Sequence, residues 1–136
     1  MMTSYQGHCL CGQVSYEISE APQMAGICHC KNCQRQAGSA FSTLWGVAKS
    51  AFTLRGESLK CYIDAETDSG AAVERHFCGH CGSPIYSALP GTPDTIFLKT
   101  GTLDDTGDFA PQFHVWCDSK QSWVDIPADQ PQMAKQ

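Results

Sequence analysis

Nine cysteines in a chain of 136 residues constrain the fold of this protein more than any other feature. The number is odd, and the first residues carry neither the basic nor the apolar part of a secretion signal, so a disulfide framework is disfavoured and a cytoplasmic location is expected. Closely grouped thiols in a reducing compartment favour thiolate metal ligands. Seven of the nine stand in such groups: Cys9-x-Cys11, Cys28-x-Cys30-x-x-Cys33 and Cys78-x-x-Cys81.

Two of these groups predict a structural zinc site. Cys9-x-Cys11 and Cys78-x-x-Cys81 together supply four thiolates, which fill a tetrahedral zinc ion and leave no place for a substrate. Such a site would tie the first strand to a hairpin around residue 85. The glycines at 12, 79 and 82 are expected to adopt the positive φ angles that such turns often need. A redox pair or another metal are the alternatives.

The third group predicts a catalytic zinc site. Cys28, Cys30 and Cys33 supply three ligands and leave one position open, where a thiol, a carbonyl oxygen or a water can bind. His29 lies between two ligands and is expected to point away from the metal, as an outer or surface group. The site would instead be purely structural if a fourth ligand came from His29, Cys61, Cys117 or His114.

Size and charge narrow the range of partners. The length predicts a single domain over residues 1–136, with a core at about 4–126 and a polar, frayed tail at 128–136. Fourteen acidic residues against nine basic ones give a formal charge of −5, and the basic residues cluster only at 31–35, so no nucleic-acid partner is expected. No apolar run approaches the ~18 residues of a membrane helix, so no membrane partner is expected either. The oligomeric state is left open.

The pattern of apolar residues predicts a mainly β fold, a sandwich or barrel. Val14, Tyr16 and Ile18 alternate with polar residues, as in a strand with one buried face. One short helix is expected from Lys31 to about Ala37, ended by Gly38. Further strands are expected at 41–47, 52–54, 59–63, 85–89, 95–99, 113–117 and 123–126, separated by turn signals rich in Gly, Pro and Asp.

Several other residues have a structural and a functional interpretation. Cys61 and Cys117 share strand faces with apolar neighbours and are expected to be buried core thiols, with a reactive role as the alternative. Phe41 and Trp45 are expected in the core.

Polar candidates lie near the open cysteine group. His114, Trp116 and Asp118 would share one face of the strand at 113–117 and line a pocket, with His114 as the candidate general base; a surface histidine is the alternative. Lys31 and Arg35 flank the group and would attract an anionic substrate, unless they are simply a solvated helix face.

The cysteine groups, taken with their flanking residues, form three longer motifs. The motifs are Gly7-x-Cys9-x-Cys11-Gly12-x-Val14-x-Tyr16, Cys28-His29-Cys30-x-x-Cys33-x-Arg35-x-x-Gly38-x-x-Phe41 and Phe77-Cys78-x-x-Cys81-Gly82-Ser83-Pro84. In this order they resemble the glutathione-dependent formaldehyde-activating enzyme family over roughly residues 4–126, and residues 101–105 and 114–123 also resemble it.

The resemblance implies a β-tent fold of stacked antiparallel sheets organised around zinc. It also implies two zinc ions per chain: a structural one on Cys9, Cys11, Cys78 and Cys81, and a catalytic one on Cys28, Cys30 and Cys33. The implied activity is that of a carbon–sulfur lyase, which makes S-hydroxymethylglutathione from formaldehyde and glutathione.

These expectations combine into reversible addition of a thiol, glutathione or a similar one, to formaldehyde or another small aldehyde. The open zinc would bind the thiol and hold it as the thiolate nucleophile. Activation of the carbonyl is less favoured, because a zinc ion with three thiolates already carries a net charge of −1. Two rivals stay open: a zinc-stabilised binding module, since the domain also resembles that of centromere protein V, and a B-type methionine sulfoxide reductase that uses Cys117.

Overall fold

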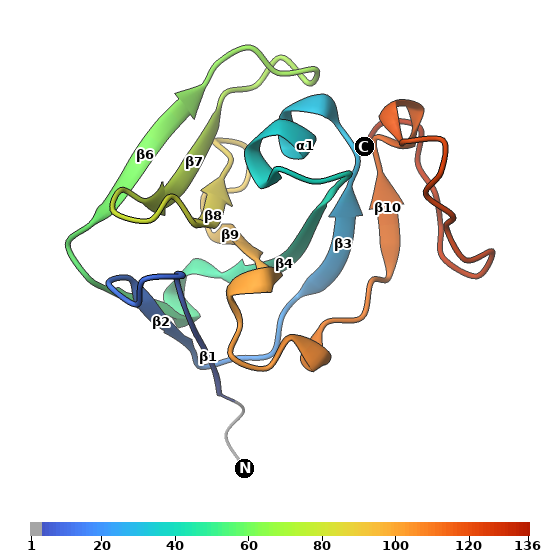
Figure 1. Ribbon diagram of the computed structural model, residues 1–136. Coiled ribbons are helices and arrows are strands. Elements are labelled where there is room, and N and C mark those ends of the chain that lie inside the picture. The colour runs from blue at the N-terminus through green and yellow to red at the C-terminus, as the bar shows by residue number, and fades with distance from the viewer. Residues whose placement is uncertain (1–3) are drawn as a thin grey trace.

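The structure, a computed structural model, describes residues 4–136 and is mainly β, with one α-helix (Figure 1). The smaller sheet is antiparallel and has the order β1-β2-β5, formed by β1 (Tyr5–His8), β2 (Ser15–Ile18) and β5 (Phe52–Arg55). The larger has the order β10-β3-β4-β9-β8-β7-β6. Its strands are β3 (Met24–Cys28), β4 (Ser42–Ala48), β6 (Leu59–Asp64), β7 (Val73–Cys78), β8 (Pro84–Ala88), β9 (Thr95–Lys99) and β10 (Phe113–Val115).

The two stacked sheets confirm the expected fold class. All strand pairs are antiparallel except that of β10 with β3, which is parallel. Short 3₁₀ turns lie at Lys49–Ala51, Thr100–Thr102, Thr106–Asp108 and Cys117–Ser119. In residues 4–136, no helix has both the length and the apolar character needed to span a membrane.

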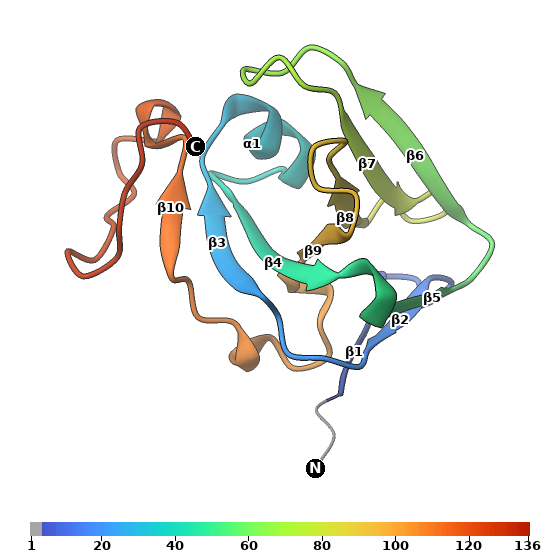
Figure 2. The ribbon, with the colours of Figure 1, turned by 180° about the vertical axis from the view of Figure 1, so that it is seen from behind.

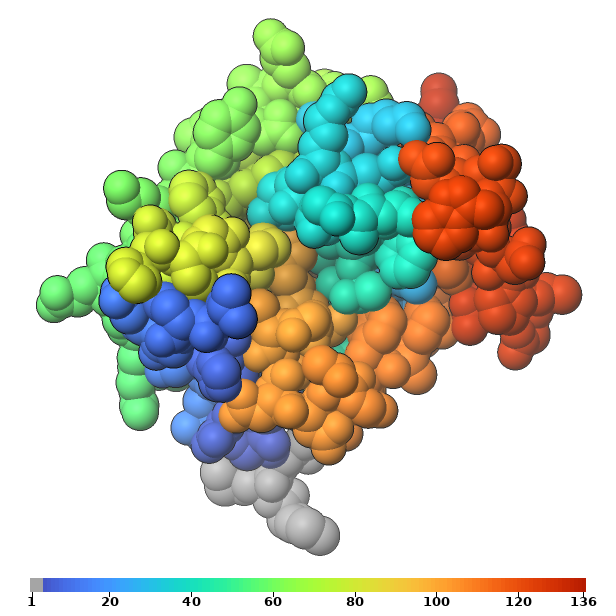
Figure 3. Space-filling view, viewed as in Figure 1, coloured from blue at the N-terminus to red at the C-terminus, as the bar shows by residue number. Residues whose placement is uncertain are grey.

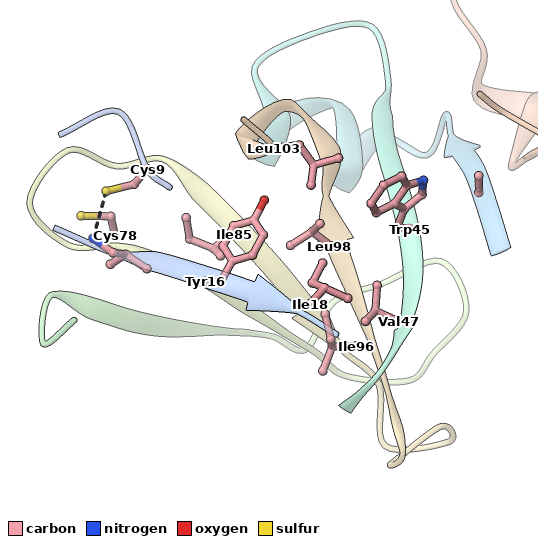
Figure 4. Packing of buried hydrophobic residues seen from close by; sticks show 12 residues of the cluster. Cys9, Tyr16, Ile18, Trp45, Val47, Cys78, Ile85, Ile96, Leu98 and Leu103 are labelled. Atoms are coloured by element: carbon pink, nitrogen blue, oxygen red, sulfur yellow. Dashed lines mark hydrogen bonds between the residues drawn. The ribbon is translucent and has the colours of Figure 1, made fainter. Parts of the chain in front are cut away.

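The main core lies between the two sheets. Side chains alternate between the two faces of a strand, so Trp45 and Val47 of β4 point to the same face. They pack with Leu98 of β9 against Tyr16 and Ile18 of β2, and all five side chains are buried (Figure 4). The other face of the larger sheet is therefore free to form a second, separate environment.

The only α-helix in residues 4–136, α1 (Lys31–Ala37), has the predicted bounds. Its first turn is capped by the Cys30 sulfur, which accepts a hydrogen bond from the Cys33 N–H at 3.2 Å. It ends at Gly38, whose φ of 67° is accessible to a residue without a side chain. The helix packs beside β3 and β4, over the face of the larger sheet opposite the main core (Figures 1 and 2).

Most predicted strands are present within one or two residues, but two predictions are wrong. Residues 123–126 form a turn in which the Val124 N–H donates to the Gln121 carbonyl, not a strand. β10 ends at Val115, because Trp116 takes a left-handed φ of 57° and residues 117–119 form a 3₁₀ turn. The strands β1, β3 and β7 were not predicted.

The expectation of a frayed tail is also wrong. The N–H of His114 donates to the Pro131 carbonyl, the N–H of Met133 donates to the His114 carbonyl, and the N–H of Trp116 donates to the Lys135 carbonyl. The tail therefore runs along the outer edge of β10, and the C-terminus ends near α1 (Figures 1 and 2). The reason is that β10 is an edge strand, whose outward N–H and C=O groups need partners.

Candidate metal centres and the adjoining cavity

The first candidate metal centre brings together four sulfurs from distant parts of the chain. The sulfurs of Cys9, Cys11, Cys78 and Cys81 all lie within 4.8 Å of one another. Cys9 and Cys11 are 3.5 Å apart, and Cys11 and Cys78 are 3.8 Å apart. Four sulfurs placed tetrahedrally at the zinc–sulfur distance of about 2.3 Å are roughly 3.8 Å apart, so the set fits a closed zinc site.

Hydrogen bonds favour the thiolate at Cys78 and Cys81, whereas the pKa of Cys11 is raised to about 12, because the lowering by the Gln13 backbone is outweighed by loss of solvation and the neighbouring sulfurs. The N–H groups of Val14 and His80 donate to the sulfurs of Cys9 and Cys78 at 3.3 and 3.4 Å. A hydrogen bond from the Ser83 hydroxyl lowers the pKa of Cys81 to about 5. Negative sulfurs are the form that binds zinc, so the site is ready for a cation.

The turns of this centre match the sequence only in part. Gly12 and Gly82 have the expected positive φ angles of 81° and 82°. Gly79 does not have a positive φ. Its lack of a side chain is needed for another reason: a Cβ atom there would lie 2.8 Å from the side chain of Lys60.

The second candidate centre consists of three buried sulfurs at one end of β3. Cys28 ends the strand, Cys30 caps α1, and Cys33 lies in its first turn. The three sulfurs lie within 4.8 Å of one another. In residues 4–136 no fourth Cys, His, Asp or Glu joins them, so none of the expected alternative ligands completes the set. Three sulfurs fit a zinc site with an open position.

Two buried cations lie beside these three sulfurs. Arg75 donates from Nε to Asp64 at 2.9 Å, and Lys99 donates from Nζ to the Ser42 hydroxyl at 2.8 Å. Both side chains are more than nine-tenths buried. Hydrogen bonds from Cys28 and Cys30, followed by the charges of Lys99 and Arg75, hold the pKa of Cys33 well below its usual range. The centre is thus built to hold negative charge.

A cavity of about 270 Å³ opens in front of the three sulfurs. It occupies the face of the larger sheet that points away from the main core. Its wall is mostly apolar, and its polar groups are few. The lining includes Met24, Gly26, Cys28, Cys30, Cys33, Leu44, Val73, Arg75, Ser87, Leu89, Phe97, Lys99, Phe113, Val115, Trp116 and the rim residues Asn32, Thr67, Asp68, Ser69 and Gln136.

His114 does not line this cavity, contrary to expectation. Along β10, Phe113 and Val115 face the cavity, so His114 between them faces the opposite side. Its Nε2–H donates to the Gln130 side-chain oxygen at 2.7 Å. Its Nδ1 therefore accepts from Nε2–H of the fully buried His29, 2.9 Å away. Trp116 does line the cavity, and Asp118 does not.

His29 is an internal group rather than a surface one. Burial, followed by the charge of His114, lowers its pKa to about 4, which keeps the ring neutral. It points away from the cavity, as predicted, and its ring meets the edge of Phe41 at 5.6 Å. The pair of histidines therefore supports the cysteine loop from behind.

Among the remaining candidate residues, the two cysteines are not the buried core thiols that were expected. Cys61 is exposed, because β6 is an edge strand whose residues 60–63 face solvent; its sulfur lies near Glu74 and His76. Cys117 is half-buried on a 3₁₀ turn rather than on the strand. Trp45 is in the core as predicted. Lys31 and Arg35 are exposed on α1, which matches the solvated helix face.

The sequence analysis missed the three polar residues Arg75, Ser87 and Lys99. They lie in strands β7, β8 and β9, where the pairing Arg75–Ser87 places neighbours on one sheet face. A charged residue inside an otherwise apolar strand such as β9 is the one signal that could have identified Lys99.

Comparisons with known proteins agree with this arrangement. Residues 4–119 match the family model described as glutathione-dependent formaldehyde-activating enzyme. A Halomonas elongata protein provisionally given that name is 29% identical over 128 residues, which cover 89% of this chain and 80% of that protein. A Schizosaccharomyces pombe protein named as an uncharacterised lyase is 26% identical, over 92% of this chain and 87% of its own.

Two further comparisons are weaker, because one spans only part of the relative and the other is a likeness of fold at low sequence identity. A Fusarium vanettenii protein with the same provisional name is 27% identical, and the match spans 61% of its length. The crystal structure of a Rhodobacter sphaeroides protein superposes with a TM-score of 0.57 at 22% identity, covering 73% of this chain and 87% of that one. This likeness shows a shared fold.

Proposed function

The chain belongs to the glutathione-dependent formaldehyde-activating enzyme family, and we propose from this membership that it is a carbon–sulfur lyase. The proposed reaction is the reversible addition of a thiol, glutathione, to formaldehyde or another aldehyde, in the cytoplasm. The observation that carries the proposal is the group of three buried sulfurs without a fourth ligand, facing a cavity. The names of the relatives support the reaction class.

The proposed cofactors are two zinc ions per chain, one at each candidate centre. Zinc held by Cys28, Cys30 and Cys33 would supply an open position that keeps a bound thiol deprotonated near neutral pH. The fit of both centres rests on the convergence of their sulfurs, and that of the open centre also on the burial of Cys28, Cys30 and Cys33.

The chain's own residues then do three things. The cavity holds the two reactants together, which removes much of the entropic cost of a bimolecular reaction. The ammonium group of Lys99 offsets the negative charge of the sulfurs and of an incoming thiolate. Lys99 is a hydrogen-bond donor on the cavity wall, and we assign it also to the carbonyl oxygen, where negative charge develops.

His114 has a positioning role in this proposal. It reaches the metal loop only through His29, which lies between Cys28 and Cys30. It holds the ring of His29, and so the loop, in one orientation.

The two rival functions find less support. In the described chain the exposed large apolar residues are few, and only Tyr62 and Ile63 are neighbours in the sequence, which does not favour a binding module. Cys117 is half-buried and outside the cavity lining, which does not favour a reductase that uses it.

The direct test replaces one sulfur of the open centre. We expect Cys30→Ser to lose the second zinc and to slow adduct formation, measured by exchange NMR of formaldehyde and glutathione, by at least ~10²-fold relative to the wild type. Cys61→Ser, at an exposed thiol, is the matched control and is expected to behave like the wild type. A folded Cys30→Ser protein that retains both zinc and full turnover would sink the proposal.

A further inference from the structure

The cavity is larger and more apolar than formaldehyde requires. Formaldehyde has two heavy atoms, on the order of twice the ~30 Å³ that one water occupies in the liquid. The cavity has about 270 Å³. An apolar cavity of roughly 150 Å³ already accepts benzene. We propose that the carbonyl substrate of this site is an aldehyde with an apolar chain or ring of about four to seven carbon atoms; this inference rests on the proposed function.

Two glycines of the sheet let large apolar side chains form the floor of this cavity: Gly26 lines it, and Gly46 lies beneath the lining residues Met24 and Phe97. Gly46 of β4 lies opposite Phe97 of β9 and Met24 of β3. A Cβ atom at residue 46 would lie 2.6 Å from the Met24 side chain, and one at Gly26 would lie 2.8 Å from the ring of Phe113. These glycines therefore let apolar side chains lie across the sheet and form a continuous apolar floor.

The walls continue this apolar surface. Leu44, Val115 and Trp116 pack against the three cysteines from one side. Val73 and Leu89 complete the lining from β7 and from the segment after β8. Burying apolar groups of a ligand against such walls is favourable, by roughly 25 cal/mol for each Å² removed from water.

The interior lining has few polar groups. Arg75 and Lys99 lie beside Cys33, at the end of the cavity that holds the sulfurs. Ser87 also lines the cavity, but its Oγ atom is itself buried. The division into one polar end and one apolar body matches a molecule with a carbonyl head and an apolar tail.

Glutathione itself is a poor match for the apolar interior. It carries two carboxylates and an ammonium group, and burying a charge without a partner is costly. Of the two buried cations, Arg75 is already paired with Asp64. The polar residues of the rim, Thr67, Asp68 and Ser69, suit the peptide instead. The rim lies where α1 and the segment after β6 meet, joined by hydrogen bonds from Asn32 (Figure 3).

The chemical step is unchanged by the larger substrate. A sulfur–carbon bond forms, the π bond of the carbonyl breaks, and the proton released by the thiol ends on the carbonyl oxygen. No electrons are transferred, and no further reactant is needed.

The test compares aldehydes on the zinc-loaded protein with glutathione. For formaldehyde, propanal, pentanal and benzaldehyde, kcat/KM is divided by the rate constant of the uncatalysed addition, which corrects for the higher reactivity of formaldehyde. We expect this ratio for pentanal or benzaldehyde to exceed that for formaldehyde by at least ~10-fold, the lower end of what one well-bound methylene gives. An equal or higher ratio for formaldehyde would overturn the inference.

A second experiment determines whether the apolar cavity binds the aldehyde or the thiol. Formaldehyde is paired with benzyl mercaptan in place of glutathione. A gain seen here, and absent with the apolar aldehydes, would overturn the assignment to the aldehyde, because the cavity would then hold the thiol.

Variants and a binding measurement separate this inference from the proposed function. Val73→Phe adds bulk inside the cavity and is expected to lower the ratio for pentanal by ~10-fold or more, and by a larger factor than the ratio for formaldehyde. Ile63→Phe, at a residue 55% exposed on β6, is the matched control.

Benzyl alcohol, an unreactive probe, is titrated in a calorimeter. Saturable binding that Val73→Phe abolishes, together with no turnover of any aldehyde, would reject the proposed function while supporting the apolar specificity. Turnover of formaldehyde without any binding of benzyl alcohol would reject the inference alone.

Discussion

Lys99 is the residue on which the electrostatics of the open centre depend most. Burial lowers its pKa, and the negative charge of Cys33 opposes that effect. Within the described chain it has no carboxylate partner, and its only hydrogen bond is to the Ser42 hydroxyl. Such a buried ammonium group is stable only if negative charge lies close by, which the three sulfurs provide.

Replacing this charge is expected to weaken thiolate binding. For Lys99→Met, which keeps the length of the side chain, we expect the KM for glutathione to rise by about 10- to 100-fold, the range of a hydrogen bond to a charged group. The zinc content is expected to stay the same. Lys60→Met, at an exposed residue of β6, is the control. An unchanged KM would show that Lys99 does not act on the thiolate.

His114 tests positioning against proton transfer. His114→Ala leaves the Nε2–H of His29 without its partner, so we expect the free energy of unfolding to fall by about 1–3 kcal/mol. We expect kcat at saturating zinc to change by less than ~10-fold, because the ring does not reach the cavity. A general base would contribute about 10²- to 10⁴-fold. If kcat of His114→Ala falls by that factor while zinc is retained, His114 acts as a general base and not as a positioning residue.

The sequence predicted the cysteine groups because their spacing along the chain is short. Cys28, Cys30 and Cys33 lie within six residues, and the two knuckles are equally local. The proximity of Arg75 and Lys99 to the sulfurs could not be predicted, although the charge of Lys99 in an apolar strand is a local signal, since only the pairing of β7, β8 and β9 brings the two cations to the sulfurs. His114 was assigned to the wrong face because the strand at 113–117 was taken as cavity-lining without knowing which side the sheet covers.

At the level of elements, the C-terminal segment behaves as an additional strand-like cover of β10. Five backbone hydrogen bonds link residues 131–135 to residues 114–118. The Trp116 indole also donates to the Gln136 side chain at 3.2 Å, which places the end of the chain at the cavity rim.

Deleting residues 131–136 is therefore expected to destabilise the protein. Each of the five lost hydrogen bonds contributes about 1 kcal/mol, so we expect the free energy of unfolding to fall by about 5 kcal/mol, measured by urea denaturation. The single substitution Gln132→Ala, which keeps the backbone pairing, serves as the control. If the truncated and full chains have the same free energy of unfolding, the C-terminal segment does not stabilise the fold, as expected of a frayed tail.

Two of the three missed strands, β3 and β7, have a common physical reason. β3 has the sequence Met-Ala-Gly-Ile-Cys, and β7 has Val-Glu-Arg-His-Phe-Cys, and neither alternates between apolar and polar residues. Both lie inside the larger sheet and have important residues on each face, so the pattern of a half-buried strand is lost. The helix, in contrast, was predicted from Lys31 to about Ala37, because its place after the cysteine group and its Gly38 stop are local signals.

At the scale of the whole molecule, the two centres have different duties. The closed centre joins the loop after β1 to the turn between β7 and β8, and so connects the two sheets at one end of the main core (Figure 4). The open centre involves only β3 and α1. Loss of metal from the first would release a contact between the sheets, and loss from the second would not.

Chelation is therefore expected to proceed in two stages. Increasing EDTA should first remove one zinc and the activity while the circular dichroism spectrum stays native, because a three-ligand site binds metal less tightly. The second zinc should leave only together with the native spectrum. Cys9→Ser is expected to unfold at lower urea than Cys30→Ser by the same argument. A single step, with both zinc ions and the fold lost together, would contradict the division of roles.

The central claim is that one chain holds a closed and an open thiolate centre. It is tested most directly by measuring zinc per chain on protein purified under reducing conditions without chelator, together with mass-spectrometric identification of the alkylated thiols. The account predicts two zinc ions, with Cys61 and Cys117 as the only alkylated cysteines. One zinc ion, with Cys28, Cys30 and Cys33 alkylated even after zinc is added, would contradict it.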